Sequence, residues 1–207
     1  MRLTEFEQQA SERLDMAVQL SCSESPASRY GLSAGEHARL DAFRYPQRRQ
    51  DWLTGRAALK ALLRRQARSA DTAAIEFPAP QWSLTHAGGI ALAAGTCTGT
   101  ARIGIDYEVL RDVNSRMARW FLDDTEQAWL AGLGDASAAR QLIRLWTIKE
   151  AAFKTHPGNQ RMLLGDFSIS DPAARGVVNV RSNRGLRIRV HCDAYRRGYL
   201  SIAGVQA

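Results

Sequence analysis

The sequence predicts an α+β protein, a pseudo-dimer of two similar lobes that are each a small antiparallel sheet packed with helices. Two observations support this prediction. Each half of the 207-residue chain runs from helical to strand-like segments, and the halves close on similar stretches, GIALAAG and GYLSIAG. Lobes of about a hundred residues match the usual size of domains. We place the first lobe at residues 1–103 and the second at residues 104–207.

The first lobe is expected to contain two helices in residues 32–68. LSAGEHARLDAF places Ser33 at an N-cap and Glu36 at the capping-box position, and RRQDWLTGRAALKALLRRQAR is amphipathic and rich in helix formers. The two prolines of DTAAIEFPAPQW indicate a turn region before a strand. SLTHAGGIALAAG and ARIGIDYEVL are apolar and glycine-bounded, which predicts short strands joined by a turn around TCTGT.

The second lobe repeats this order of helices and then strands. SRMARWFLDDTEQAWLAGLG and DASAARQLIRLWTIKEAAFKT predict consecutive helices separated at Gly132 and Gly134. Four later segments alternate between apolar and polar residues, as antiparallel strands do: FSISD, GVVNVRS, LRIRVHC and GYLSIAGV.

The composition indicates a soluble protein with an anionic partner. The formal net charge is +7 and the pI is near 9.8, a balance that suits nucleic acid, a polyphosphate small molecule or an acidic protein. A basic surface that serves only solubility is the alternative. The first twenty residues lack the apolar centre of a signal peptide, and no apolar run is long enough to span a bilayer.

The cysteines indicate a reducing, cytoplasmic location. There are three, they are far apart and no CxxC pair occurs, which argues against a disulfide framework or a zinc site. They are Cys22, Cys97 and Cys192.

The segment RLWTIKEAAFKT, residues 144–155, carries charge where an amphipathic helix should be apolar. At 100° per residue, Lys149 falls near the centre of the apolar arc and Glu150 at its edge. Trp146, Glu150 and Lys154 recur every four residues along one flank. One interpretation is a functional site. The alternative is that Lys149 snorkels to solvent and Glu150 pairs with Lys154 on the surface.

A pair of carboxylates in IGIDYE suggests a metal site. The period of two in a strand places Asp106 and Glu108 on one face, with Ile103 and Ile105 on the other. Adjacent carboxylates repel unless a cation lies between them, and Mg²⁺ bound by carboxylates, water and substrate phosphate would relieve the repulsion. A solvated acidic strand end is the alternative.

His86 in SLTHAGG precedes two glycines at the end of a predicted strand. Such a turn exposes backbone amides, and a histidine beside them can donate a hydrogen bond to a phosphate oxygen. The alternative is a surface turn residue, or a partly buried histidine that bonds to a carbonyl.

Taken together, these segments resemble the 4′-phosphopantetheinyl transferases, in particular the larger, monomeric class typified by the surfactin-synthetase activator. SLTH corresponds to the family's S-x-S-H element. GIDYE corresponds to G-I-D-x-E, and WTIKEAAFK corresponds to W-x-x-K-E-A-x-x-K. FLDDTEQAWL resembles the stretch between the last two elements, and RRQDWLTGRAALKALL resembles the family's basic helix. The resemblance runs from about Leu32 to Lys154.

This resemblance implies an active site at the interface of the lobes, with coenzyme A as substrate and Mg²⁺, or Mn²⁺, as cofactor. The implied metal ligands are Asp106, Glu108 and Glu150. The implied coenzyme contacts are Arg39, Arg48, Arg56, Thr85, His86, Lys149 and Lys154. Arg39 stands where the family has a basic residue for the 3′-phosphate. Solvation is the alternative for Arg48 and Arg56, and electrostatic support is the alternative for Lys149.

Two departures from the family pattern bear on these contacts. Thr85 replaces the usual serine and keeps the hydroxyl. The G-K-P segment of many relatives is replaced by EFPAPQW, so the family's adenine and ribose contacts cannot be transferred to this chain.

The implied reaction is that of a holo-[acyl-carrier-protein] synthase type transferase. Phosphopantetheine passes from coenzyme A to a serine of an acidic acyl or peptidyl carrier protein, in secondary metabolism for example, and 3′,5′-adenosine diphosphate is released. The implied catalytic residues are Asp106, Lys154 and Glu150, with Glu150 as general base and Glu108 or a water as alternatives. The enzyme is expected to be a cytoplasmic monomer that binds neither nucleic acid nor membrane.

A basic nucleic-acid-binding protein without catalysis is the alternative function. The arginine excess, together with Trp52, Trp82 and Trp129, gives it some support. The distinctive positions are nevertheless acids spaced for a metal, whereas nucleic-acid modules gather cations and aromatic residues on one face.

Overall fold

The computed structural model describes residues 1–25, 27–97, 99 and 101–205. The helices are α1 (Leu3–Leu14), α2 (Ala34–Asp41), α3 (Pro46–Arg65), α4 (Asp124–Ala131) and α5 (Asp135–Thr155), with short 3₁₀ helices η1 (Ser115–Trp120), η2 (Asn159–Arg161) and η3 (Leu164–Asp166). The strands are β1 (Val18–Glu24), β2 (Trp82–Ala87), β3 (Ile90–Thr96), β4 (Arg102–Val109), β5 (Phe167–Ile169), β6 (Gly176–Ser182), β7 (Arg187–Tyr195) and β8 (Gly198–Val205).

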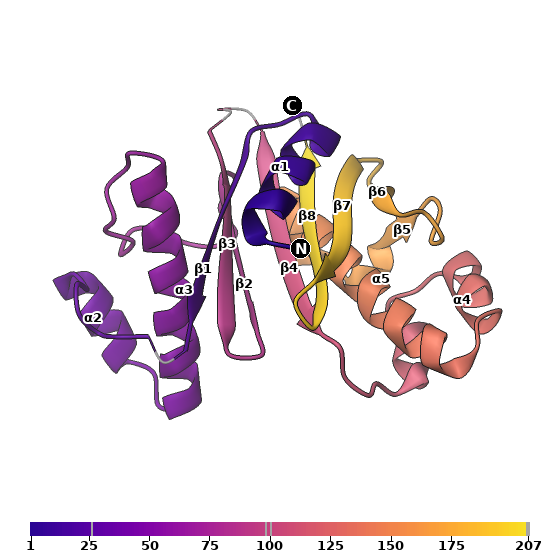
Figure 1. The fold of residues 1–207 in the computed structure, drawn as a ribbon, viewed down its shortest axis with the longest axis horizontal. Helices are drawn as coiled ribbons and strands as arrows, with labels where there is room; N and C mark the ends of the chain where they lie inside the picture. The colour runs from indigo at the N-terminus through magenta and orange to yellow at the C-terminus, as the bar shows by residue number, and fades with distance from the viewer. Residues whose placement is uncertain (26, 98, 100, 206–207) are drawn as a thin grey trace.

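The strands form two antiparallel sheets, which confirms the predicted α+β class. The smaller sheet has the order β1-β3-β2, and the larger has the order β4-β8-β7-β6-β5. The sheets lie beside each other, with α3 on the outer side of the smaller sheet and α5 against the larger one (Figure 1). Each sheet therefore packs against one long helix.

Most predicted elements are present. The helices expected in residues 32–68 are α2 and α3, and Ser33 and Glu36 form the expected capping box. The second of the two helices separated by glycines is α5, and the four alternating segments are β5 to β8. The first is shorter than predicted, because α4 begins at Asp124 and the start of its segment forms η1 instead. The turn expected around TCTGT lies partly outside the described residues, because positions 98 and 100 are not described. Helix α1 and strand β1 are not among the predicted elements.

A shared core fills the space between the two sheets. Phe6, Ala10 and Leu14 of α1 pack there against both sheets. The other face of β3 packs on α3, so β3 is buried on both sides. The strand residues of the shared core are Val18, Leu20, Ile90, Leu92, Ala94, Ile103, Ile105, Tyr107, Tyr195, Leu200 and Ile202. The two sheets and α1 thus share one apolar core.

Helix α5 approaches β4 closely on the face opposite this core. A Cβ on Gly104 would lie 2.1 Å from the carbonyl oxygen of Ala151, so only glycine allows the contact. Because side chains alternate along a strand, Asp106 faces α5 as Gly104 does, while Ile103 and Ile105 enter the core. The predicted division of faces in IGIDYE is therefore confirmed.

Strand β2 of one sheet runs beside β4 of the other, and side chains rather than a backbone ladder bridge them. Ser83 Oγ accepts a hydrogen bond from the backbone amide of Ile105 at 3.1 Å. Thr85 Oγ1 accepts one from the amide of Tyr107 at 3.2 Å. The period of two in SLTH therefore places both hydroxyls on the seam between the lobes.

Within the described part of the chain, no helix combines the length and apolar character needed to cross a membrane.

Candidate active site

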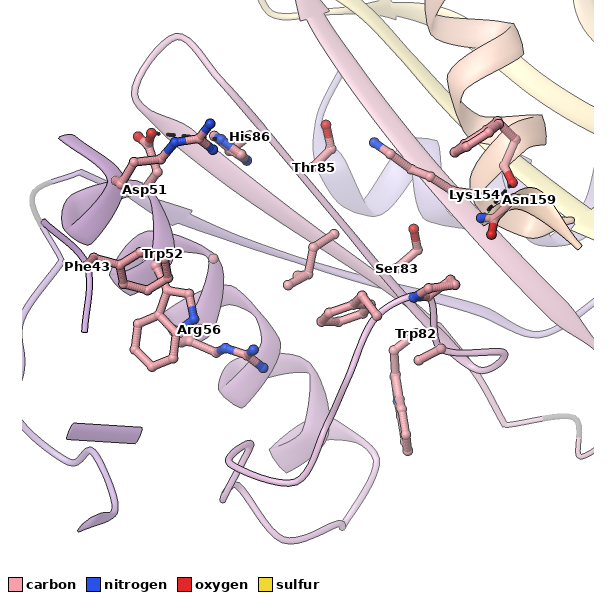
Figure 2. A pocket seen from close by; sticks show the side chains of 17 residues that line it. Phe43, Asp51, Trp52, Arg56, Trp82, Ser83, Thr85, His86, Lys154 and Asn159 are labelled. Carbon is pink, nitrogen blue, oxygen red and sulfur yellow. Dashed lines mark hydrogen bonds and ion pairs between the residues drawn. The ribbon is translucent and has the colours of Figure 1, made fainter. Parts of the chain in front are cut away.

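A pocket of about 450 Å³ opens between α3, the segment before β2, β2 itself and the last turn of α5. It is lined by Phe43, Arg48, Asp51, Trp52, Gly55, Arg56, Phe77, Pro78, Ala79, Trp82, Ser83, Leu84, Thr85, His86, Phe153, Lys154 and Asn159. Figure 2 shows Thr85 and Lys154 near each other, the Asp51 and His86 pair at one end, and Arg56 beside Trp52. The pocket thus contains five of the predicted coenzyme contacts.

At the seam, the pocket meets a buried polar cluster centred on Asp106. Lys154 Nζ donates to Asp106 Oδ1 at 2.8 Å and to the carbonyl of Ile105 at 3.1 Å. Thr85 Oγ1 also donates to Asp106 Oδ1, at 3.0 Å, and so links the two lobes through this carboxylate. Asp106 is only 4% exposed. The cluster joins β2, β4 and α5, which matches the predicted grouping of their motifs.

The negative charge of Asp106 and its neighbouring carboxylates is only partly neutralised by nearby cations. Asp106 Oδ2 is buried and has no hydrogen-bond partner among the described residues. Burial raises the pKa of Glu150, and repulsion from Asp106 and Glu108 adds to the rise, which Lys154 only partly offsets. An unpartnered buried oxygen and mutually repelling acids fit a bound divalent cation.

The side chains of these acids do not, however, lie close enough together to form a preformed metal site among the described residues. Among the described residues, no three His, Cys, Asp or Glu side chains lie close enough to hold an ion. Two of the three predicted ligands pair with cations instead, Asp106 with Lys154 and Glu108 with Arg111.

His86 lies at the end of β2 and lines the pocket, as predicted. Its side chain is about half exposed, and Nε2 is 3.9 Å from Oδ2 of Asp51 on α3. Asp51 also accepts a hydrogen bond from Gln47. The imidazole is therefore accessible to solvent and to the pocket, and the Asp51 carboxylate lies beside it (Figure 2).

Arg56 is held in the wall of the pocket and is only 6% exposed. Its guanidinium lies 5.1 Å from the ring centre of Trp52 and 5.8 Å from that of Phe77. Burial lowers its pKa, and the charge of Arg39 lowers it further. A buried guanidinium near a second cation is a favourable place for an anion.

The other predicted arginines differ in position. Arg48 lines the pocket. Arg39 is exposed on α2, outside the pocket lining, and its charge lowers the pKa of Arg56.

Aromatic residues of the pocket wall were missed by the sequence reasoning. The sequence gives Trp52 and Trp82 only as support for nucleic-acid binding, and EFPAPQW lacks the G-K-P segment from which family contacts could be transferred. In the structure Phe77 and Pro78 of that segment line the pocket with both tryptophans. The available signal was the aromatic and proline content of a segment directly before SLTH.

Lys149 is a predicted coenzyme contact, but the structure places it away from the pocket. Its side chain is completely buried, and Nζ donates to Glu126 Oε2 at 2.5 Å and to the carbonyl of Phe121 at 2.6 Å. Glu126 also accepts from the backbone amides of Ile169 and Asp123. Lys149 therefore holds η1, α4, α5 and β5 together. It neither lines the cleft nor snorkels to solvent, and it could not reach a phosphate without breaking this pair.

Comparison with known proteins shows similarity to one enzyme superfamily. Residues 102–199, which include Asp106, Glu108, Glu150 and Lys154, match the model of the 4′-phosphopantetheinyl transferase superfamily. The chain is 30% identical to 4′-phosphopantetheinyl transferase HetI of Nostoc sp., over 59% of this chain and 58% of that protein. Residues 102–199 are thus similar to the 4′-phosphopantetheinyl transferase superfamily.

Among solved structures, the chain is similar to the holo-[acyl-carrier-protein] synthase of Thermotoga maritima. The TM-score is 0.41 and the identity 18%, over 50% of this chain and 62% of that one. The match to HetI spans less than two thirds of that relative.

Proposed function

We propose that this protein transfers 4′-phosphopantetheine from coenzyme A to a serine of an apo carrier protein. The observation that supports this most is the Asp106 cluster, where Thr85, Lys154 and an unpartnered carboxylate oxygen meet at the edge of a cationic and aromatic pocket. The superfamily match covers the two motifs that supply Asp106 and Lys154.

The pocket has the chemistry to bind coenzyme A. Lys154 at one end and Arg56 at the other provide positive charge for phosphates, and His86 can donate a hydrogen bond to a phosphate oxygen. Trp52 and Phe77 provide apolar faces on which an adenine ring can stack. The cationic ends keep the nucleotide and its pyrophosphate in one orientation, with the pyrophosphate toward Lys154.

The transfer step relies on positioning and charge. Lys154 neutralises charge on the pyrophosphate as the bond between phosphorus and the leaving oxygen breaks. Glu150 lies one helical turn before Lys154 and accepts the proton of the attacking serine hydroxyl. Asp106, Glu108 and Glu150 are the residues that would hold Mg²⁺ or Mn²⁺, and the ion would then help to neutralise the charge of the pyrophosphate.

The partner is proposed to be an acidic acyl or peptidyl carrier protein. A net charge of +7 favours association with an acidic surface. Because one chain supplies both sides of the seam, a monomer is sufficient for activity. The free cysteines Cys22, Cys97 and Cys192 fit a reducing, cytoplasmic location.

The test is to incubate the protein with coenzyme A, Mg²⁺ and a panel of apo acyl and peptidyl carrier proteins, and to measure intact masses. We expect at least one carrier to gain one phosphopantetheine, and the same carrier with its acceptor serine changed to alanine to gain none. The Asp106→Asn variant should give no product while keeping the wild-type circular dichroism spectrum. Unmodified carriers together with salt-sensitive binding of DNA would favour the nucleic-acid alternative.

A further inference from the structure

Glu36 makes more contacts than its place in a capping box requires. It lies in the first turn of α2, is completely buried, and accepts the backbone amide of Ser33 at 2.8 Å as the capping box predicts. It also forms an ion pair with Lys60 of α3 at 2.6 Å. Both the amide and the hydroxyl of Thr72 donate to its other oxygen. The carboxylate therefore joins α2, α3 and the segment that leads to β2.

Thr72 connects this carboxylate to the pocket. Its side chain and amide face Glu36, while its carbonyl oxygen accepts a hydrogen bond from Nη1 of Arg56 at 3.3 Å. Arg56 lies against Trp52 and against Phe77, which follows Thr72 by five residues. One residue thus separates a fully buried carboxylate from the guanidinium in the pocket wall.

The segment around Thr72 has little other regular structure to hold it. Residues 66–81 lie between α3 and β2 and form neither helix nor strand. Burial would raise the pKa of Glu36, yet the hydrogen bonds from Lys60, Thr72 and Ser33 lower it to about 2, so the carboxylate is charged at neutral pH. A charged acceptor strengthens each of these hydrogen bonds.

We propose that Glu36 is a positioning residue for coenzyme binding: through Thr72 it fixes Arg56, and with it the Phe77 wall, in the geometry that receives the coenzyme. This inference rests on the proposed function. Glu36 reaches the pocket only through Thr72 and Arg56 and does not touch the reacting atoms. Its loss therefore weakens coenzyme binding and leaves the transfer step almost unchanged.

The experiment measures binding of coenzyme A by calorimetry in the presence of Mg²⁺, together with KM and kcat. We expect Glu36→Gln to raise Kd and KM about tenfold, the size of one charge-assisted hydrogen bond, with kcat within about twofold of wild type. The matched control is Glu5→Gln, because Glu5 occupies the same capping-box position in α1 and is not among the residues that line the pocket. That control should bind coenzyme A as wild type does.

A double-variant cycle separates positioning from a general loss of structure. If Glu36 acts through Arg56, Glu36→Gln should weaken binding only slightly further once Arg56→Met is present. Thr72→Val keeps the backbone amide and carbonyl but removes the hydroxyl, and it should give a smaller loss in the same direction should Glu36→Gln not fold.

Three outcomes would overturn the proposal. Wild-type affinity in folded Glu36→Gln, or in Thr72→Val where Glu36→Gln does not fold, refutes the positioning role. Full additivity with Arg56→Met refutes the route through Arg56. Absence of coenzyme binding in the wild type refutes the proposed function, and the inference with it. This outcome is distinct from the other two, because it is seen in the wild-type protein and not only in a variant.

Discussion

Changing Lys149 to methionine tests whether this residue is structural. Lys149 and Glu126 are both completely buried, and their charged atoms are 2.5 Å apart. Removing one partner of a buried ion pair leaves an uncompensated charge and costs about 3 to 5 kcal/mol. Two backbone amides still bond to Glu126, so we expect the lower end, about 3 kcal/mol.

The assay is urea unfolding of the wild type, Lys149→Met and the double variant Lys149→Met/Glu126→Gln. The double variant should recover part of the loss, because glutamine keeps the hydrogen-bond acceptor without the buried charge. Coenzyme A should bind to Lys149→Met with wild-type affinity, since Nζ faces Phe121 and Glu126. A Lys149→Met protein of normal stability with weakened coenzyme binding would refute this reasoning. It would favour the predicted contact between Lys149 and a phosphate of the coenzyme.

Three further variants test the seam and its charges. Lys154→Met should weaken coenzyme binding and lower turnover, because the ammonium bonds to Asp106 at the pocket edge; unchanged kinetics would remove Lys154 from the site. Ser83→Ala should lower the unfolding free energy by about 1 to 3 kcal/mol, because it leaves the amide of Ile105 without its acceptor, and unchanged urea curves would contradict this. Because the folded pKa of Glu36 is about 2 against an ordinary 4.5, its contribution of about 3 kcal/mol is complete above pH 4.5 and is lost as the pH falls toward 2. Glu36→Gln should remove this part of the acid sensitivity in urea titrations at pH 6 and pH 3, so an equal loss in both proteins would contradict the assignment.

The sequence predicts well where the signal is local. The period of two in IGIDYE separates Asp106 from the core residues, and the period of four in the last turns of α5 brings Lys154 to the same side as Glu150. Helix α1 carries a similar signal, because Phe6, Ala10 and Leu14 are spaced by four and all enter the core. The helix is nevertheless not among the predicted elements, because the first twenty residues serve there only to exclude a signal peptide.

The sequence predicts poorly where a residue's role depends on a distant partner. Lys149 has the pattern of a functional cation, but its partner Glu126 lies 23 positions away. The same holds for Glu36, whose capping box is visible in the sequence while its contacts with Lys60 and Thr72 are not. Such contacts follow from tertiary packing, which no local period encodes.

The most direct test of the account is product stoichiometry with a carrier that the protein modifies. The released 3′,5′-adenosine diphosphate is quantified by chromatography, and the modified serine is identified by peptide mapping of the carrier. We expect one nucleotide released for each phosphopantetheine attached, on a single serine. Nucleotide release without attachment, or attachment at scattered residues, would contradict transfer at the seam beside Asp106 and Lys154.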